Sequence, residues 1–96
     1  MLTSKQRAYL RGLANGVPAL YQIGKDGITD NLVSMIKDAL EARELIKIHV
    51  LETAPDTPRN LCDQLAEKVG GEPVQAIGSK ITIYKEASEN PAIILP

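Results

Sequence analysis

The chain has little of what metal sites and enzyme active sites are built from. Its 96 residues include one cysteine, one histidine, three tyrosines and neither tryptophan nor phenylalanine. Cys62 has no second thiol for an internal disulfide, and Cys62 with His49 is too small a ligand set for zinc. No nucleophile and base stand at a spacing typical of a triad, and no carboxylates are paired for acid-base chemistry. We therefore expect a protein that is not an enzyme and takes no cofactor, metal or small-molecule substrate.

Long apolar runs are missing as well. No stretch approaches the ~18 residues of a membrane span, and polar residues stand where a secretory signal would need an apolar segment. The single unpaired cysteine favours a reducing compartment. The sequence thus predicts a cytoplasmic protein without a membrane partner. Its three tyrosines are too few for the stacking platforms of single-strand binders.

Acidic residues are missing from one end of the chain. The totals are 11 basic and 12 acidic residues, a net charge of -1, which argues against a protein that coats nucleic acid through bulk positive charge. The first acid is Asp26, and four basic residues precede it: Lys5, Arg7, Arg11 and Lys25. This distribution predicts a local cationic face suited to a selective anionic partner.

What is present is a regular alternation of helical and strand patterns. We expect helices that begin at the cap residues Thr3, Thr29 and Thr57, and strands over residues 19–23, 45–51, 74–77 and 80–84. The order helix, strand, helix, strand, helix, strand, strand predicts an α/β fold with a four-stranded mixed sheet packed with helices. Residues 1–86 form this single domain, and residues 87–96 form a C-terminal tail that is either loose or docked.

The first helix carries two kinds of side chain on different sides. Tyr9, Leu10 and Leu13 share an apolar side, whereas Arg7 and Arg11, four residues apart, stack on another side. The arginines should face water or a partner.

Residues 24–27, Gly-Lys-Asp-Gly, connect the first strand to the second helix and form the GxxG loop. Gly24 and Gly27 leave no side chain to bar a close approach to the backbone. Thr29 caps a helix end whose free amides and dipole suit phosphate, and Lys25 adds a mobile cation. An ordinary turn that needs glycine only for its geometry is the alternative.

Four blocks of the sequence resemble a known family. These blocks are LTSKQRAYLR at residues 2–11, IGKDGIT at 23–29, ALEARELIK at 39–47, and QAIG at 75–78 with IYK at 83–85. They are similar to the bacterial, YhbY-like members of the CRM (chloroplast RNA splicing and ribosome maturation) family. The resemblance spans residues 2–85. It implies a fold similar to the C-terminal domain of the third bacterial translation initiation factor.

The resemblance also implies a function and a site. It implies an RNA-binding protein that associates with ribosomal RNA in precursors of the large (50S) ribosomal subunit and assists its assembly. The GxxG loop would clamp the RNA backbone as KH domains do. The implied RNA-binding residues are Gly24, Lys25, Asp26, Gly27 and Thr29 of the loop and cap, Lys5, Arg7 and Arg11 of the first helix nearby, and Lys85.

Two features depart from the family pattern. Asp26 puts a carboxylate beside Lys25, and the tail carries Glu86 and Glu89 where family tails are often basic. For the loop we expect Gly27→Asp to weaken RNA binding while it leaves the fold largely intact.

A different class of function stays open at this point. A sheet edge or the apolar residues 92–95 could recruit a protein partner, with the basic face conferring only solubility. Affinity for phosphate falls steeply with ionic strength, whereas an apolar interface is insensitive to salt, so the two hypotheses are separable. The oligomeric state is not predicted.

Overall fold

The sheet and its helices follow the predicted order. The structure, a computed structural model, describes residues 2–96. Its elements are α1 (Ser4–Ala14), β1 (Ala19–Ile23), α2 (Asp30–Arg43), β2 (Leu45–Val50), α3 (Pro58–Val69), β3 (Glu72–Ile77) and β4 (Lys80–Tyr84). The predicted α/β fold is therefore confirmed.

The four strands form one mixed sheet in the order β1-β2-β4-β3. β1 lies parallel to β2, and β4 lies antiparallel to both β2 and β3. β1 and β3 are consequently the two edges. β3 begins at Glu72, earlier than predicted, because Pro73 is tolerated in a strand that has a neighbour on one side only. Gly78 has a φ of 57° in the β3–β4 turn, as the first central residue of a type II′ turn requires.

Threonines begin all three helices, as predicted. The side chains of Thr3, Thr29 and Thr57 each accept a hydrogen bond from the amide three residues further on, and Gln6 completes a capping box with Thr3. Gly70 ends α3 in the left-handed conformation. Each of these caps is a local interaction, so the sequence around it determines it.

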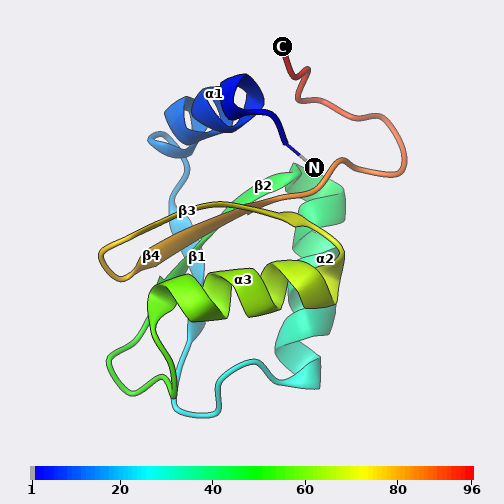
Figure 1. Cartoon of the computed structure of the whole chain (residues 1–96). Coiled ribbons are helices and arrows are strands. Elements are labelled where there is room, and N and C mark those ends of the chain that lie inside the picture. The colour runs from blue at the N-terminus through cyan, green and yellow to red at the C-terminus, as the bar shows by residue number, and fades with distance from the viewer. Residues whose placement is uncertain (1) are drawn as a thin grey trace.

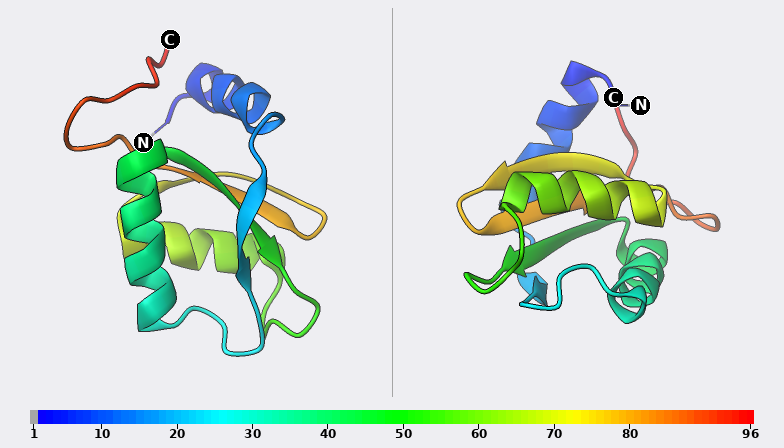
Figure 2. Two further views of the ribbon diagram at one scale, coloured as in Figure 1. Left: turned by 180° about the vertical axis from the view of Figure 1, so that it is seen from behind. Right: turned by 60° about the horizontal axis from the view of Figure 1, so that its bottom comes forward.

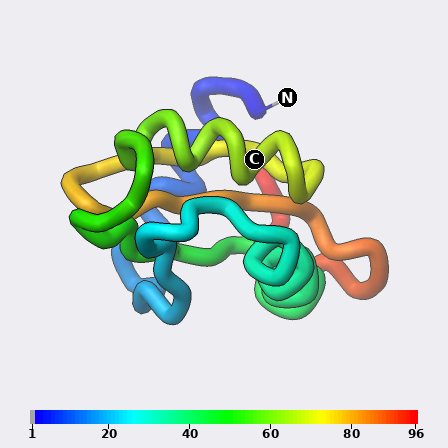
Figure 3. The backbone as a smooth tube through the Cα atoms, turned by 90° about the horizontal axis from the view of Figure 1, so that it is seen from below, coloured from blue at the N-terminus to red at the C-terminus, as the bar shows by residue number. Residues whose placement is uncertain are grey.

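Two groups of apolar side chains lie on the two faces of the sheet. The larger core contains Ile46, Ile48 and Val50 of β2 and packs against α2 and α3, which cover one face. The smaller core lies on the other face, where Leu10 and Ala14 of α1 are buried together with other apolar residues: Leu45, Val74 and Tyr84. Figures 1 to 3 show α1 alone on this side of the sheet.

Part of the predicted apolar side of α1 does not pack. Tyr9 is 44% and Leu13 is 39% exposed, whereas Leu10 is fully buried. The predicted apolar side was therefore too wide: the buried apolar residues of α1 are Leu10 and Ala14, and Tyr9 and Leu13 remain partly exposed to solvent.

The C-terminal segment lies along the end of α2 and turns toward α1. Glu44, which is 2% exposed, accepts hydrogen bonds from the amides of Ala87, Ala92 and Ile93 at 2.9, 2.7 and 2.8 Å. Ile93 and Leu95 pack against the smaller core. Figure 1 shows the resulting position of the C-terminus close to α1. The segment is thus docked on the domain.

No helix within residues 2–96 combines the length and apolar character that crossing a bilayer requires.

Candidate nucleic-acid interface

The GxxG loop is a tight turn at the junction of β1 and α2. The amide of Gly27 donates to the carbonyl of Gly24 at 3.0 Å. This bond closes a four-residue turn with Lys25 and Asp26 exposed at its tip. The turn therefore presents backbone and one side chain of each charge to solvent.

The two glycines of the loop have different roles in the fold. Gly27 is buried and has a φ of 66°, and a Cβ on it would lie 3.0 Å from Cγ of Pro55. The structure argues against the expectation that Gly27→Asp leaves the fold largely intact, because a side chain at this φ is strained and its Cβ would crowd Pro55. A Cβ on Gly24 would meet Cδ1 of Leu51 at 3.6 Å, an ordinary contact. The fold does not require a glycine at position 24.

A groove of about 440 Å³ lies beside the loop. Its lining includes the residues of the loop, Asn31 and Met35 of α2, and Thr53. The ionisable residues in its lining are Lys25 and Asp26, whose charges oppose each other. The groove therefore carries little net charge.

The helix end next to the groove is only partly available to an anion. The hydroxyl of Thr29 accepts from the amide of Leu32 at 3.1 Å, which satisfies one of the free donors of the first turn. Asp30 places a carboxylate in that turn, where it interacts with the helix dipole itself. Thr29 thus shapes the loop through capping, and Asp30 weakens the attraction for a phosphate.

The basic face of α1 lies away from the loop. In Figure 1 and in the left view of Figure 2, α1 is at the top of the molecule and the chain between β1 and α2 is at the bottom. Arg7 donates to the carbonyl of Pro73, and Arg7 and Arg11 line a groove with Arg59 beside β3. The structure therefore corrects the expectation that these arginines contact a ligand next to the loop.

Two further predicted residues also lie apart from the loop. Lys5 is exposed on α1. Lys85 follows β4, and its amide donates to the carbonyl of Glu44 at 2.8 Å. The pKa of Glu41 is lowered by hydrogen bonds from Ser88 and, to a smaller degree, by the charge of Lys85. Lys85 therefore lies in the acidic surroundings of the docked C-terminal segment.

Three basic residues near β3 were not predicted as site residues. Arg59 stands in the first turn of α3 beside Arg7 and Arg11. Lys47 and Lys80 line a groove of about 430 Å³ on the sheet face that α1 leaves open. The alternation of β2 predicts that Lys47 faces away from the larger core, but only the strand order places it near Lys80.

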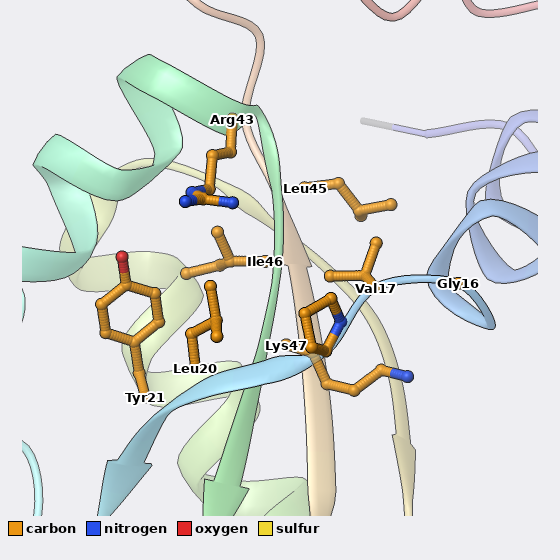
Figure 4. Close-up of a pocket in the computed structure, with 9 residues that line it drawn as sticks. Gly16, Val17, Leu20, Tyr21, Arg43, Leu45, Ile46 and Lys47 are labelled. Carbon is orange, nitrogen blue, oxygen red and sulfur yellow. The ribbon is translucent and has the colours of Figure 1, made fainter.

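A smaller, apolar pocket of about 230 Å³ lies between the α1–β1 connection and β2. Figure 4 shows Val17, Leu20 and Ile46 around it, with Arg43 and Lys47 at the rim. The only other ionisable lining group is Tyr21. The pocket holds no carboxylate, imidazole or thiol for acid-base or nucleophilic chemistry.

The single thiol is held inside the larger core. Cys62 is 1% exposed, and burial raises its pKa to about 11. It behaves as a small buried hydrophobe rather than as a nucleophile. Within residues 2–96, no three His, Cys, Asp or Glu side chains come together in a way that could hold a metal ion.

Comparison with known proteins gives consistent relatives over the whole chain. Residues 2–85 match the model of the CRS1 / YhbY (CRM) domain. "Probable RNA-binding protein YqeI" of Bacillus subtilis is 42% identical over 96 residues, which is all of both chains. An "RNA-binding protein" of Haemophilus influenzae is 30% identical over 92% of this chain and 89% of its own.

A plant protein and a solved structure extend the comparison. "CRS2-associated factor 2, chloroplastic" of rice (Oryza sativa subsp. japonica) is 32% identical over 72% of this chain, which corresponds to 11% of the plant protein. The solution structure of the Staphylococcus aureus protein SAV1595 is 50% identical, covers 100% of both chains and superposes with a TM-score of 0.84. From the fold and from the match over residues 2–85, we conclude that the chain belongs to the CRS1 / YhbY (CRM) domain family.

Proposed function

We propose that this protein is a cytoplasmic, non-enzymatic RNA-binding factor that associates with ribosomal RNA in precursors of the large (50S) ribosomal subunit and assists assembly of that subunit. The GxxG loop holds the RNA backbone. The names of the bacterial relatives support RNA as the partner. We propose in addition that this RNA is ribosomal RNA in precursors of the large subunit.

The geometry of Gly24 is the observation that carries the role of the loop. The fold tolerates a Cβ at this position, so the glycine is better explained by a ligand that lies against the backbone. Lys25, exposed at the tip of the turn, supplies the charge that a phosphate requires. Asp26 repels phosphate, but its oxygens are acceptors for a ribose 2′-hydroxyl, the group that distinguishes RNA from DNA.

The competing hypothesis of a protein partner recruited by the apolar tail has lost its main support. Ile93 and Leu95 pack against the smaller core, and Ile94, which is 84% exposed, is the one large apolar side chain of the tail that points to solvent. An apolar tail that is folded onto its own domain offers little surface to a partner.

Sedimentation across a ribosome gradient tests the proposal. A tagged natural protein is compared with a Gly24→Asp, Lys25→Gln variant and with Lys37→Gln, which removes one charge from an exposed position on α2 outside the described grooves. We expect the natural protein and the Lys37 variant to travel with large-subunit precursors at low salt and the loop variant to stay at the top. If all three remain at the top, the ribosomal partner is wrong. If all three travel equally, the loop is not the RNA site.

A further inference from the structure

Five basic residues gather beside β3 and on the neighbouring sheet face, away from the GxxG loop. Arg7, Arg11 and Arg59 line a groove of about 480 Å³ along this strand. Lys47 and Lys80 line the groove on the open sheet face. Gln75 and Ile77 of β3 belong to the lining of both grooves, so the two adjoin. We call the surface formed by these seven residues the β3 edge surface.

The linings of the two grooves contain basic residues and no acidic ones among the described residues. The groove beside the GxxG loop differs, because Asp26 opposes Lys25 there. On a chain with a net charge of -1, five basic residues gathered in two adjoining grooves predict a local attraction for polyanions.

The fold leaves the β3 edge surface open to a ligand. β3 pairs with β4 on one side only, and Figure 1 shows it running between α1 and α3 without a further strand. Arg11 and Arg59 are exposed, and Ile77 is 66% exposed. Arg7 donates to the carbonyl of Pro73, which anchors its guanidinium at the strand.

The arrangement of the cations favours a polymer over a single small anion. Three arginines come from α1 and α3, which lie on opposite faces of the sheet beside β3, and two lysines come from β2 and β4. A single phosphate needs donors that converge on one point, whereas spaced cations match the repeating phosphates of a nucleic acid. Arginine also binds phosphate through two parallel donors.

We propose that the β3 edge surface is a second RNA-binding site, which binds backbone phosphates of the same RNA that the GxxG loop holds. This inference rests on the proposed RNA-binding function. The two sites lie on different parts of the molecule, so a bound RNA spans both of them. The loop provides close backbone contact, and the edge surface provides most of the charge-dependent affinity.

Filter binding to a transcript of large-subunit ribosomal RNA, at salt from about 50 to 200 mM, tests the second site. The variant Arg11→Gln, Arg59→Gln removes two charges from the surface and leaves the Arg7 anchor in place. The control Lys37→Gln, Lys68→Gln removes two exposed charges elsewhere. Circular dichroism verifies that both variants are folded.

We expect the arginine variant to bind about tenfold more weakly and to show a salt slope smaller by up to about 2, because two phosphate contacts are lost. The lysine control should change the affinity for RNA less than about threefold. The two lysines lie away from the proposed site, and salt screens their attraction for the RNA phosphates. Arg11→Lys, Arg59→Lys should recover most of the lost affinity.

The outcomes separate this inference from the proposed function. If the arginine variant matches the lysine control while Gly24→Asp, Lys25→Gln weakens binding, the second site is refuted and the role of the loop stands. If the natural protein itself binds the transcript weakly and without salt dependence, both the proposed function and the second site are refuted.

Discussion

At the scale of single residues, the two loop glycines separate what the fold needs from what a ligand needs. Gly27 has a positive φ and lies close to Pro55, so the fold itself requires a glycine at this position. Gly24 has room for a Cβ against Leu51. A variant at position 27 therefore tests the fold, and only a variant at position 24 tests recognition.

This difference predicts that alanine at position 27 affects the stability of the fold, whereas alanine at position 24 affects RNA binding. Gly27→Ala should lower the free energy of unfolding by roughly 1 to 3 kcal/mol, because a Cβ at positive φ is strained and this one lies against Pro55. Gly24→Ala should stay within about 0.5 kcal/mol of the natural protein yet weaken RNA binding. Urea unfolding followed by circular dichroism measures both. Equal destabilisation by the two substitutions would remove the reason for assigning Gly24 to a ligand.

At the scale of elements, Glu44 links the end of α2 to the C-terminal segment. Its φ is 65°, an unfavourable conformation for a residue with a side chain. Burial opposes its ionisation, but hydrogen bonds from Ala87, Ile93 and Ala92 outweigh that effect and lower its pKa below the ordinary 4.5. Because the folded pKa is depressed, the carboxylate stabilises the fold above about pH 4.5, and this contribution is lost as the pH falls through the folded value.

The Glu44 contacts predict a pH-dependent effect of Glu44→Gln. The amide group of glutamine would place a donor against backbone donors, so we expect a loss of about 1 to 3 kcal/mol in unfolding free energy at neutral pH. When the pH is lowered below 4.5 and through the folded pKa, the difference from the natural protein should shrink, because the natural carboxyl is then protonated as well. Urea unfolding at the two pH values measures this.

Glu41→Gln is the matched control, because Glu41 bonds Ser88 of the same segment from an exposed position. A Glu44 difference that is equal at both pH values would show that the charge of Glu44 plays no part in docking.

The success of sequence-based prediction differs between these elements. Helix starts at Thr3, Thr29 and Thr57 were predictable, because each cap bonds an amide only three residues away. The hydrogen bonds of Glu44 were not predictable from the sequence, because they join residues more than 40 positions apart. The exposure of Tyr9 was missed for a related reason: periodicity gives the apolar side of a helix but not how much of that side the sheet covers.

At the scale of the whole molecule, the same reasoning explains which parts of the site could be predicted. The GxxG loop is contiguous, so the sequence brings its members together. The β3 edge surface joins Arg11 of α1 to Arg59 of α3 and to Lys47 of β2. Only the strand order and the position of α1 on the second face create that surface, and a single sequence does not contain either.

In the proposed complex, one RNA binds at two places on one domain. The loop contributes a close approach to the backbone with little net charge, and the β3 edge surface contributes five basic side chains from grooves whose described lining residues include no acids. The C-terminal segment, docked through Glu44, lies outside both places. Contacts to RNA should therefore avoid it.

Hydrogen exchange followed by mass spectrometry, with and without a transcript of large-subunit ribosomal RNA, tests whether RNA binds at both the GxxG loop and the β3 edge surface. The account predicts slower amide exchange on RNA binding in peptides that cover residues 24–31 and residues 72–80, and unchanged exchange in residues 86–96. Protection confined to residues 86–96, or no protection at low salt, would contradict it.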